Sequence, residues 1–188
     1  KAGISKRLID FSKTIVGPLP GGLAMVVILA SMFFSALTGT ALAAAAAIGG
    51  MMLPAMKEEG YDPRFSASLV ATSSTIGPII PPSIVLILYG GIANVSIGDL
   101  FIAGIIPGIL MGLGLMIYSF FMGRKYEYRF SETRATFKEF LIGLKDATLA
   151  LIMPLIIIGG IASGVFTATE SGVIAVVYAF IIGMFVYK

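Results

Sequence analysis

The sequence predicts an all-α polytopic membrane protein. Of its 188 residues, 57% are hydrophobic and only 12% are charged, and the mean hydropathy is +1.00. A soluble domain of this size cannot bury so much apolar surface. The apolar residues fall into runs close to the ~20 residues that a helix needs to cross a bilayer. The absence of Cys and His argues against redox and metallohydrolase chemistry.

Charged turns and stretches rich in Gly or Pro divide the chain into parts. Asp62 followed by Pro63 predicts the start of a helix. Thr167 and Glu170 have the spacing of a capping box and predict another. The expected parts are an amphipathic surface lead-in at 1–20, a hairpin at 21–57, a broken transmembrane helix at 63–93, a transmembrane helix at 100–122, a loop with a surface helix at 123–140, and two transmembrane helices at 141–188.

The basic residues indicate how the chain is oriented in the membrane. Almost every Lys and Arg lies in the lead-in, in the turn 57–64 or in 123–145, whereas the turns 93–99 and 165–171 have none. Basic loops face the cytoplasm, so 57–64 and 123–140 are predicted to be cytoplasmic. The basic residues are therefore interpreted as orientation signals and lipid contacts, not as a nucleic-acid site.

The segment 21–57 is predicted to be a re-entrant hairpin. Its two apolar arms are short, and the second is rich in Ala and Gly, which suits close helix packing better than contact with lipid. The turn between the arms, Leu37 to Thr40, carries no charge, unlike an exposed loop. Two full spans would leave the orientation of the other loops unchanged, but a tip buried in protein fits these residues better.

The stretch Gly77-Pro78-Ile79-Ile80-Pro81-Pro82 interrupts an otherwise apolar helix. Proline has no N–H, so these prolines are expected to free the carbonyls of Ser74, Gly77 and Pro78, and residues before proline avoid the helical conformation. We expect two half-helices with an unwound segment between them. Irregular backbone at membrane depth is tolerated only where it lines a cavity or is buried in protein.

The hairpin tip and the break share one property. Each is expected to leave free carbonyls at the end of one helix, which suit a cation, and free N–H groups at the start of the next, which suit an anion. Interrupted helices with opposed termini indicate the binding site of a secondary transporter. The predicted Na⁺ ligands are Ser35, Thr38, Gly77, Ile80 and Pro82. The residues predicted near the substrate are Thr40, Ser83, Gly39 and Thr75. The alternative for the tip hydroxyls is packing, with hydrogen bonds to carbonyls four residues earlier.

Three stretches of the chain resemble one known family. They are residues 29–90, SIGDLFIAGIIPG and GVFTATESGVIAVVYA. The family is the large membrane subunit of the tripartite ATP-independent periplasmic (TRAP) transporters. The resemblance covers nearly the whole chain. It implies sodium-coupled symport of an organic anion, such as a C4-dicarboxylate or a sialic or other sugar acid, across a bacterial or archaeal inner membrane. It also implies Na⁺ as the coupling ion, a small membrane subunit, and a periplasmic binding protein that delivers the substrate.

The resemblance further implies an elevator-type ion-transporter fold with two inverted repeats. Each repeat has a re-entrant hairpin and a broken helix, and 21–57 and 63–93 match the first pair. The chain is therefore expected to be a fragment that covers roughly the first repeat. The tip Thr38-Gly39-Thr40 keeps the hydroxyls of the family's usual Ser-Gly-Ser, whereas Ala168 stands where the family usually has Pro.

An enzyme is not expected. The predicted spans contain no His, no Cys and no pair of Asp or Glu, so they offer neither a nucleophile with its base nor a set of metal ligands. Two rival functions fit the same residues: a structural membrane subunit that transports nothing, and a related anion transporter of the same superfamily that uses no binding protein.

Overall fold

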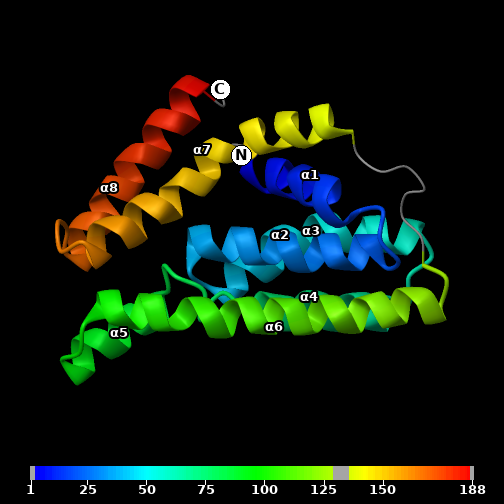
Figure 1. The fold of residues 1–188 in the computed structure, drawn as a ribbon, viewed down its shortest axis with the longest axis horizontal. Helices are drawn as coiled ribbons and strands as arrows, with labels where there is room; N and C mark the ends of the chain where they lie inside the picture. The colour runs from blue at the N-terminus through cyan, green and yellow to red at the C-terminus, as the bar shows by residue number, and fades with distance from the viewer. Residues whose placement is uncertain (1–2, 129–135, 187–188) are drawn as a thin grey trace.

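The computed structural model describes residues 3–128 and 136–186 of the chain. All regular elements in these two ranges are helices, arranged as a long bundle (Figure 1). They are α1 (Ile4–Val16), α2 (Gly22–Thr38), α3 (Ala41–Glu58), α4 (Pro63–Ser74), α5 (Ile84–Ala93), α6 (Ile97–Lys125), α7 (Phe137–Ala162), α8 (Ala168–Ile181) and the π-helical turn η1 (Ile182–Val186).

Two helices begin at the caps that the sequence predicts. The Asp62 carboxylate accepts hydrogen bonds from the backbone N–H groups two and three residues ahead, both at 2.9 Å, and Pro63 is the first residue of α4. Before α8, the Thr167 N–H donates to the Glu170 carboxylate at 2.8 Å, and the Glu170 N–H donates to the Thr167 hydroxyl at 3.2 Å. Both predicted helix starts are confirmed.

The helices fall into two length classes. In the described residues, three are long and apolar enough to cross a membrane: α6, α7 and the run Ala168–Phe185. The other apolar helices are shorter, with 17 residues in α2 and 10 in α5. The described residues are therefore all-helical with three helices of membrane-spanning length and apolarity, as predicted, and the two shorter apolar helices lie in the segments that the sequence marks as interrupted.

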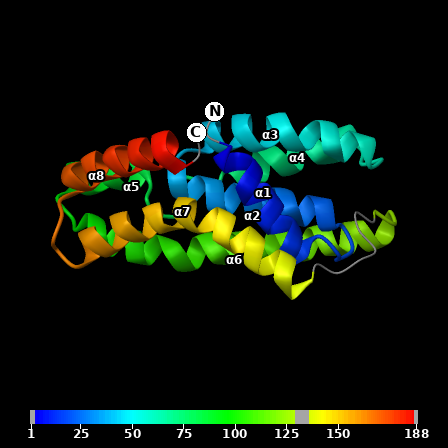
Figure 2. The same cartoon turned by 90° about the horizontal axis from the view of Figure 1, so that it is seen from above.

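Helix α2 is the centre of the bundle. It packs against α1, α3, α4, α6 and α7, and Figures 1 and 2 show it surrounded by them. Every residue from Gly22 to Ile28 is buried. The Ser73 hydroxyl of α4 donates to the Ser31 hydroxyl of α2 at 3.2 Å inside this core. One face of the polar run 72–75 therefore packs on the hairpin.

The hairpin formed by α2 and α3 runs beside only part of α6. Gly21, just before α2, contacts Gly123 near the C-terminus of α6, and its N–H donates to the Tyr128 carbonyl at 2.9 Å. Further along, Met32 packs on Gly112 of α6. At 1.5 Å per residue, α2 extends about 25 Å whereas α6 extends about 43 Å. The tip therefore lies beside the N-terminal half of α6.

A row of small residues on α6 receives the hairpin and the break. A Cβ at Gly104 would lie 2.5 Å from the Ile79 carbonyl oxygen, and one at Gly108 would meet the Ile80 side chain. Toward the C-terminus, a Cβ at Gly123 would run into the backbone of Gly21. Small residues allow such close approach between membrane helices, so α6 packs directly on both interrupted segments.

We expect Gly123→Ala to destabilise the protein by about 1–3 kcal/mol, because the added methyl meets backbone that has no rotamer to change. The matched control is Gly114→Ala, on the same helix, where a Cβ has nothing within 4 Å. That substitution should be neutral or stabilising by up to about 1 kcal/mol, through helix propensity. Thermal unfolding of the solubilised permease compares the two. Equal stability of both variants would contradict the close contact.

Candidate functional site

The hairpin tip reverses the chain in two residues. Gly39 has a left-handed φ of 63° and ends α2, and its N–H donates to the Ser35 carbonyl at 2.7 Å. Thr40 is extended, and its hydroxyl accepts from the Ala43 N–H at 3.3 Å, which caps α3. Helix α2 continues to Thr38 and Gly39 takes up the Ser35 carbonyl, so this carbonyl is not among the free carbonyls that we expected at the tip.

The break extends from residue 75 to residue 83, between α4 and α5. The Ser74 carbonyl accepts from the Gly77 N–H at 3.0 Å, and the Pro78 carbonyl accepts from the Ser83 hydroxyl at 2.7 Å. Two of the three carbonyls that we expected the prolines to free are therefore satisfied by local turns. The structure shows no such bond to the Gly77 carbonyl from the residues that it describes.

The tip and the break touch each other through their backbones. A Cβ at Gly77 would lie 2.9 Å from the carbonyl carbon of Thr40 and 3.0 Å from its oxygen. A Cβ at Gly39 would lie 2.5 Å from the Pro82 carbonyl oxygen and 3.3 Å from the Cα of Ser83. Both glycines are buried. The structure thus brings the two interruptions together, and neither contact has room for a side chain.

Helix starts meet at this junction. Thr40 caps α3 and contacts Gly77, while Ser83 caps α5 by accepting from the Leu86 N–H at 3.2 Å. The backbone nitrogen of Ile84, the first residue of α5, would lie 3.2 Å from a Cβ at Gly39. Two helix N-termini, each with partial positive charge, therefore lie next to the Pro82 carbonyl oxygen.

Three of the predicted cation ligands lie at the junction or within one turn of it. Gly77 and Pro82 form part of the contact itself. Ser35 is one turn before the tip and fully buried, and its hydroxyl has no hydrogen-bond partner within the described ranges. An unpaired hydroxyl in such a place costs about 1–3 kcal/mol, so Ser35 is the residue here that most needs a ligand or a water.

The other two predicted cation ligands have partners of their own. The Thr38 hydroxyl donates to the Phe34 carbonyl at 3.2 Å, which is the packing arrangement, although its oxygen keeps lone pairs that can accept. Ile80 points its side chain at Gly108 of α6.

The residues predicted near the substrate are divided in the same way. Gly39, Thr40 and Ser83 are all at the junction. Thr75 is exposed at the end of α4, and its hydroxyl donates to the Thr72 carbonyl at 2.7 Å. No group of three or more Asp, Glu, His or Cys residues in the described ranges is placed to hold a metal ion. The oxygen atoms available at the junction are therefore hydroxyls and peptide carbonyls.

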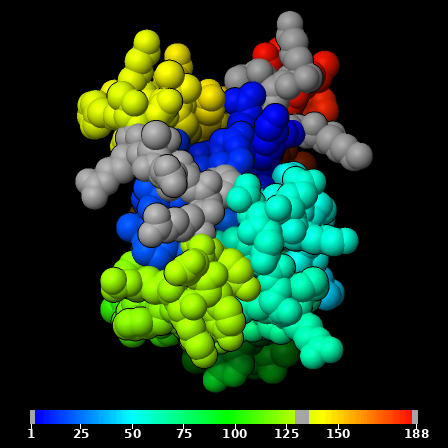
Figure 3. All heavy atoms as spheres, turned by 90° about the vertical axis from the view of Figure 1, so that its right-hand side faces the viewer, coloured from blue at the N-terminus to red at the C-terminus, as the bar shows by residue number. Residues whose placement is uncertain are grey.

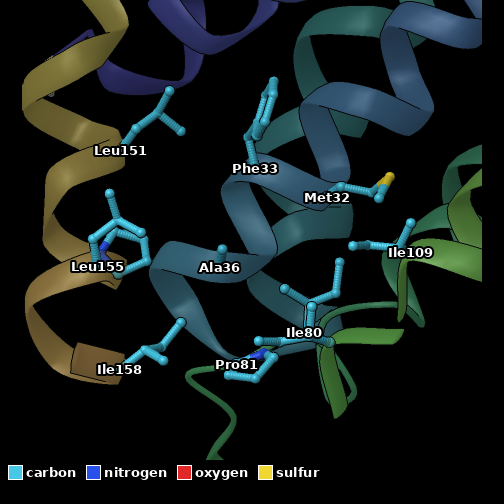
Figure 4. A pocket seen from close by; sticks show the side chains of 11 residues that line it. Met32, Phe33, Ala36, Ile80, Pro81, Ile109, Leu151, Leu155 and Ile158 are labelled. Atoms are coloured by element: carbon cyan, nitrogen blue, oxygen red, sulfur yellow. The ribbon is translucent and has the colours of Figure 1, made fainter. Parts of the chain in front are cut away.

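An apolar pocket of about 350 Å³ lies beside the break (Figure 4). Its walls come from α2, the break, α6 and α7, and every lining residue is apolar. The sequence did not indicate this pocket, because residues from four separate elements form it. They are Met32, Phe33, Ala36, Ile80, Pro81, Ile105, Ile109, Leu151, Pro154, Leu155 and Ile158.

The model of one protein family, described as "Tripartite ATP-independent periplasmic transporter, DctM component", matches residues 1–188. The chain belongs to this family. The resemblance found in the sequence is thereby confirmed. Since the DctM component is part of a transporter, the expectation that the chain is not an enzyme is confirmed as well.

Curated relatives of this DctM chain have transporter names. The sialic acid TRAP transporter large permease protein SiaM of Vibrio cholerae is 43% identical over 187 residues, which are 100% of this chain and 44% of the relative. The isethionate TRAP transporter permease protein DctMQ of Oleidesulfovibrio alaskensis is 42% identical over 186 residues, 99% of this chain and 29% of the relative. The C4-dicarboxylate TRAP transporter large permease protein DctM of Pseudomonas aeruginosa is 40% identical over 186 residues, which are 99% of this chain and 43% of the relative. The chain spans less than half the length of these relatives.

We expect Gly77→Ala to push the tip away from the break, because its Cβ meets the Thr40 backbone. Overpacking of about 1–3 kcal/mol should speed amide hydrogen exchange at the start of α3 roughly tenfold. Exchange is read by mass spectrometry on the purified permease. Gly91→Ala is the control, since a Cβ there has nothing within 4 Å. Unchanged exchange in Gly77→Ala would mean that the tip does not rest on the break.

Proposed function

We propose that this chain forms one half of the ion and substrate site in a sodium-coupled symporter of organic anions. The observation that carries the proposal is the junction of the hairpin tip with the break. It combines two helix N-termini, a carbonyl oxygen and a fully buried hydroxyl with no partner among the described residues, all contributed by interrupted helices. Such a junction is the usual place for the binding site of a secondary transporter.

Na⁺ suits the oxygen atoms of this junction. The proposed ligands are the hydroxyls of Ser35 and Thr38 and the carbonyls of Gly77, Ile80 and Pro82. All five are oxygen donors, which hard cations prefer, and all are electrically neutral, so the proposed site contains no carboxylate. Ser35 supports the assignment most strongly, because its buried hydroxyl lacks a partner in the described residues. Ile80 supports it least, because the contacts that its backbone N–H and its side chain make are with Ile76 and Gly108, not with the tip.

The substrate is proposed to be an organic anion bound near Thr40 and Ser83. Both residues start a half-helix at the junction, where free N–H groups and the helix dipole favour negative charge. Gly39 and Thr75 are the further proposed contacts. The relatives are named for sialic acid, isethionate and C4-dicarboxylates, which are all organic anions.

The packing supports a re-entrant hairpin that moves as one body with the broken helix, as in an elevator mechanism. The hairpin covers only part of α6, and α3 runs back from the tip toward the end of the bundle at which α2 begins. It is joined to α4 by the Ser31–Ser73 hydrogen bond and to the break by the junction. We further propose that a small membrane subunit and a periplasmic binding protein assemble with this permease in the inner membrane, with loops 57–64 and 123–140 in the cytoplasm.

Replacing Ser35 tests the Na⁺ site. Ser35→Ala should raise the Na⁺ concentration for half-maximal uptake roughly tenfold, because a bond between a charged group and a neutral partner contributes about 1.5–3 kcal/mol. Thr38→Val should act in the same direction. The control is Ser119→Ala, which removes another buried serine hydroxyl without a partner in the described residues, located on α6 beside Gly21. Uptake of organic anions is measured in proteoliposomes that contain the complete system.

Two results of that experiment would contradict the proposal. An unchanged Na⁺ response in both variants would remove their hydroxyls from the site. Uptake that proceeds equally without a Na⁺ gradient would contradict sodium coupling itself.

A cysteine pair tests the single moving body. The chain has no Cys, so Ser31→Cys with Ser73→Cys introduces an isolated pair whose native hydroxyl oxygens are 3.2 Å apart. We expect oxidation to join α2 to α4 while uptake stays within about twofold of that of the reduced protein, because a link inside one rigid body does not oppose its motion. The two single-cysteine variants are the controls. Uptake lost on oxidation and regained on reduction would show that α2 and α4 move against each other.

A further inference from the structure

A second hollow lies between α1 and the base of the hairpin, away from the junction. Its volume is about 260 Å³. Residues of α1 form one wall, and residues near the start of α2 and the end of α3 form the other. The lining residues are Lys6, Ile9, Asp10, Lys13, Leu23, Met51, Met52 and Ala55. Figure 3 looks at this end of the molecule, where the blue surface of α1 adjoins the cyan surface around the end of α3.

The hollow has an apolar floor and a charged rim. Ile9, Leu23 and Met52 are buried at the floor, and Met51 continues the apolar surface outward with 43% of its area exposed. The rim consists of side chains from α1. Lys6 and Lys13 are seven residues, or two helical turns, apart on it, with Asp10 between them.

The rim keeps a positive charge after its internal ion pair is counted. The Lys13 ammonium is 3.2 Å from the Asp10 carboxylate, and the neighbouring Arg7 pairs with Asp146 of α7 at 3.7 Å. Within the described ranges, Lys6 has no carboxylate at salt-bridge distance. The Lys6 ammonium is therefore a positive charge on the rim, above an apolar floor, that no described carboxylate neutralises.

We propose that this hollow binds an anionic phospholipid. The acyl chain lies on the floor formed by α2 and α3, and the phosphate meets the ammonium groups of Lys6 and Lys13. Helix α1 has the amphipathic form of a helix that lies in the membrane interface, and its apolar side is buried against the bundle. Interfacial lysines attract anionic headgroups. The site is independent of the proposed transport activity, and its test reads bound lipid instead of uptake.

The test compares lipids retained by the complete purified permease in native mass spectrometry, with phosphatidylglycerol and phosphatidylcholine as the two probes. Lys6→Gln with Lys13→Gln should lower retained phosphatidylglycerol roughly tenfold and leave phosphatidylcholine unchanged. The control is Lys138→Gln with Lys145→Gln on α7. This pair has the same seven-residue spacing and the same loss of charge, but it does not line the hollow. It should retain phosphatidylglycerol like the wild type.

A second pair of variants tests the floor. Ala55→Leu fills the hollow without changing any charge and should reduce retention of phosphatidylglycerol, whereas Ala46→Leu, at an exposed position of the same helix, should not. Equal loss of lipid in the two lysine double variants would show general surface attraction and overturn the proposal. The proposal would also be overturned if lipid retention were unchanged in the Lys6→Gln, Lys13→Gln double variant or in Ala55→Leu. Displacement of the lipid by inorganic phosphate would overturn it too, because that result would indicate a site for the free ion.

Discussion

The backbone contact between the hairpin tip and the break is the constraint on which the rest of this structure depends. Each segment alone leaves peptide groups without helical partners, which is costly wherever water is excluded. Placed together, they shield one another. Gly39 faces the Pro82 carbonyl oxygen and Gly77 faces the Thr40 backbone, so the approach is as close as peptide groups allow. The remaining helices serve this contact: α2 supplies the central packing surface, and the small residues of α6 let both interrupted segments lie against one helix.

The same contact explains why site and scaffold are difficult to separate in this protein. Thr40 and Ser83 cap helices and also lie at the candidate site, so their hydroxyls hold the half-helices in place and border the proposed ligands. Ser35 differs from them, since its buried hydroxyl has no partner in the described residues and caps no helix. A cation that used the oxygen of this hydroxyl would offset the cost of burying it, which is why Ser35 supports the proposed Na⁺ site. Preorganised oxygen atoms of this kind lower the entropy cost of binding an ion.

Local chemistry made most of the fold predictable. Asp62 before Pro63, and Thr167 with Glu170, indicated helix starts correctly because capping depends on a few adjacent residues. The prolines indicated the break, but not how its carbonyls are used: the Gly77 N–H reaches Ser74 and the Ser83 hydroxyl reaches Pro78 through turns that the sequence does not specify. The use of the Ser35 carbonyl was missed for a similar reason, since it depends on the left-handed cap that Gly39 adopts after α2. The apolar pocket beside the break and the hollow beside α1 depend on long-range packing, which no local pattern encodes.

The contacts of Gly39 and Gly77 also limit how this sequence can drift over evolutionary time. A clash between two side chains can be relieved by a compensating change in either one. Here the opposing atoms belong to the main chain of Pro82 and Thr40, which every amino acid shares, so no second substitution restores the fit. The two glycines are thus constrained by main-chain atoms alone, whereas a side chain that lines the apolar pocket meets other side chains and can change together with them.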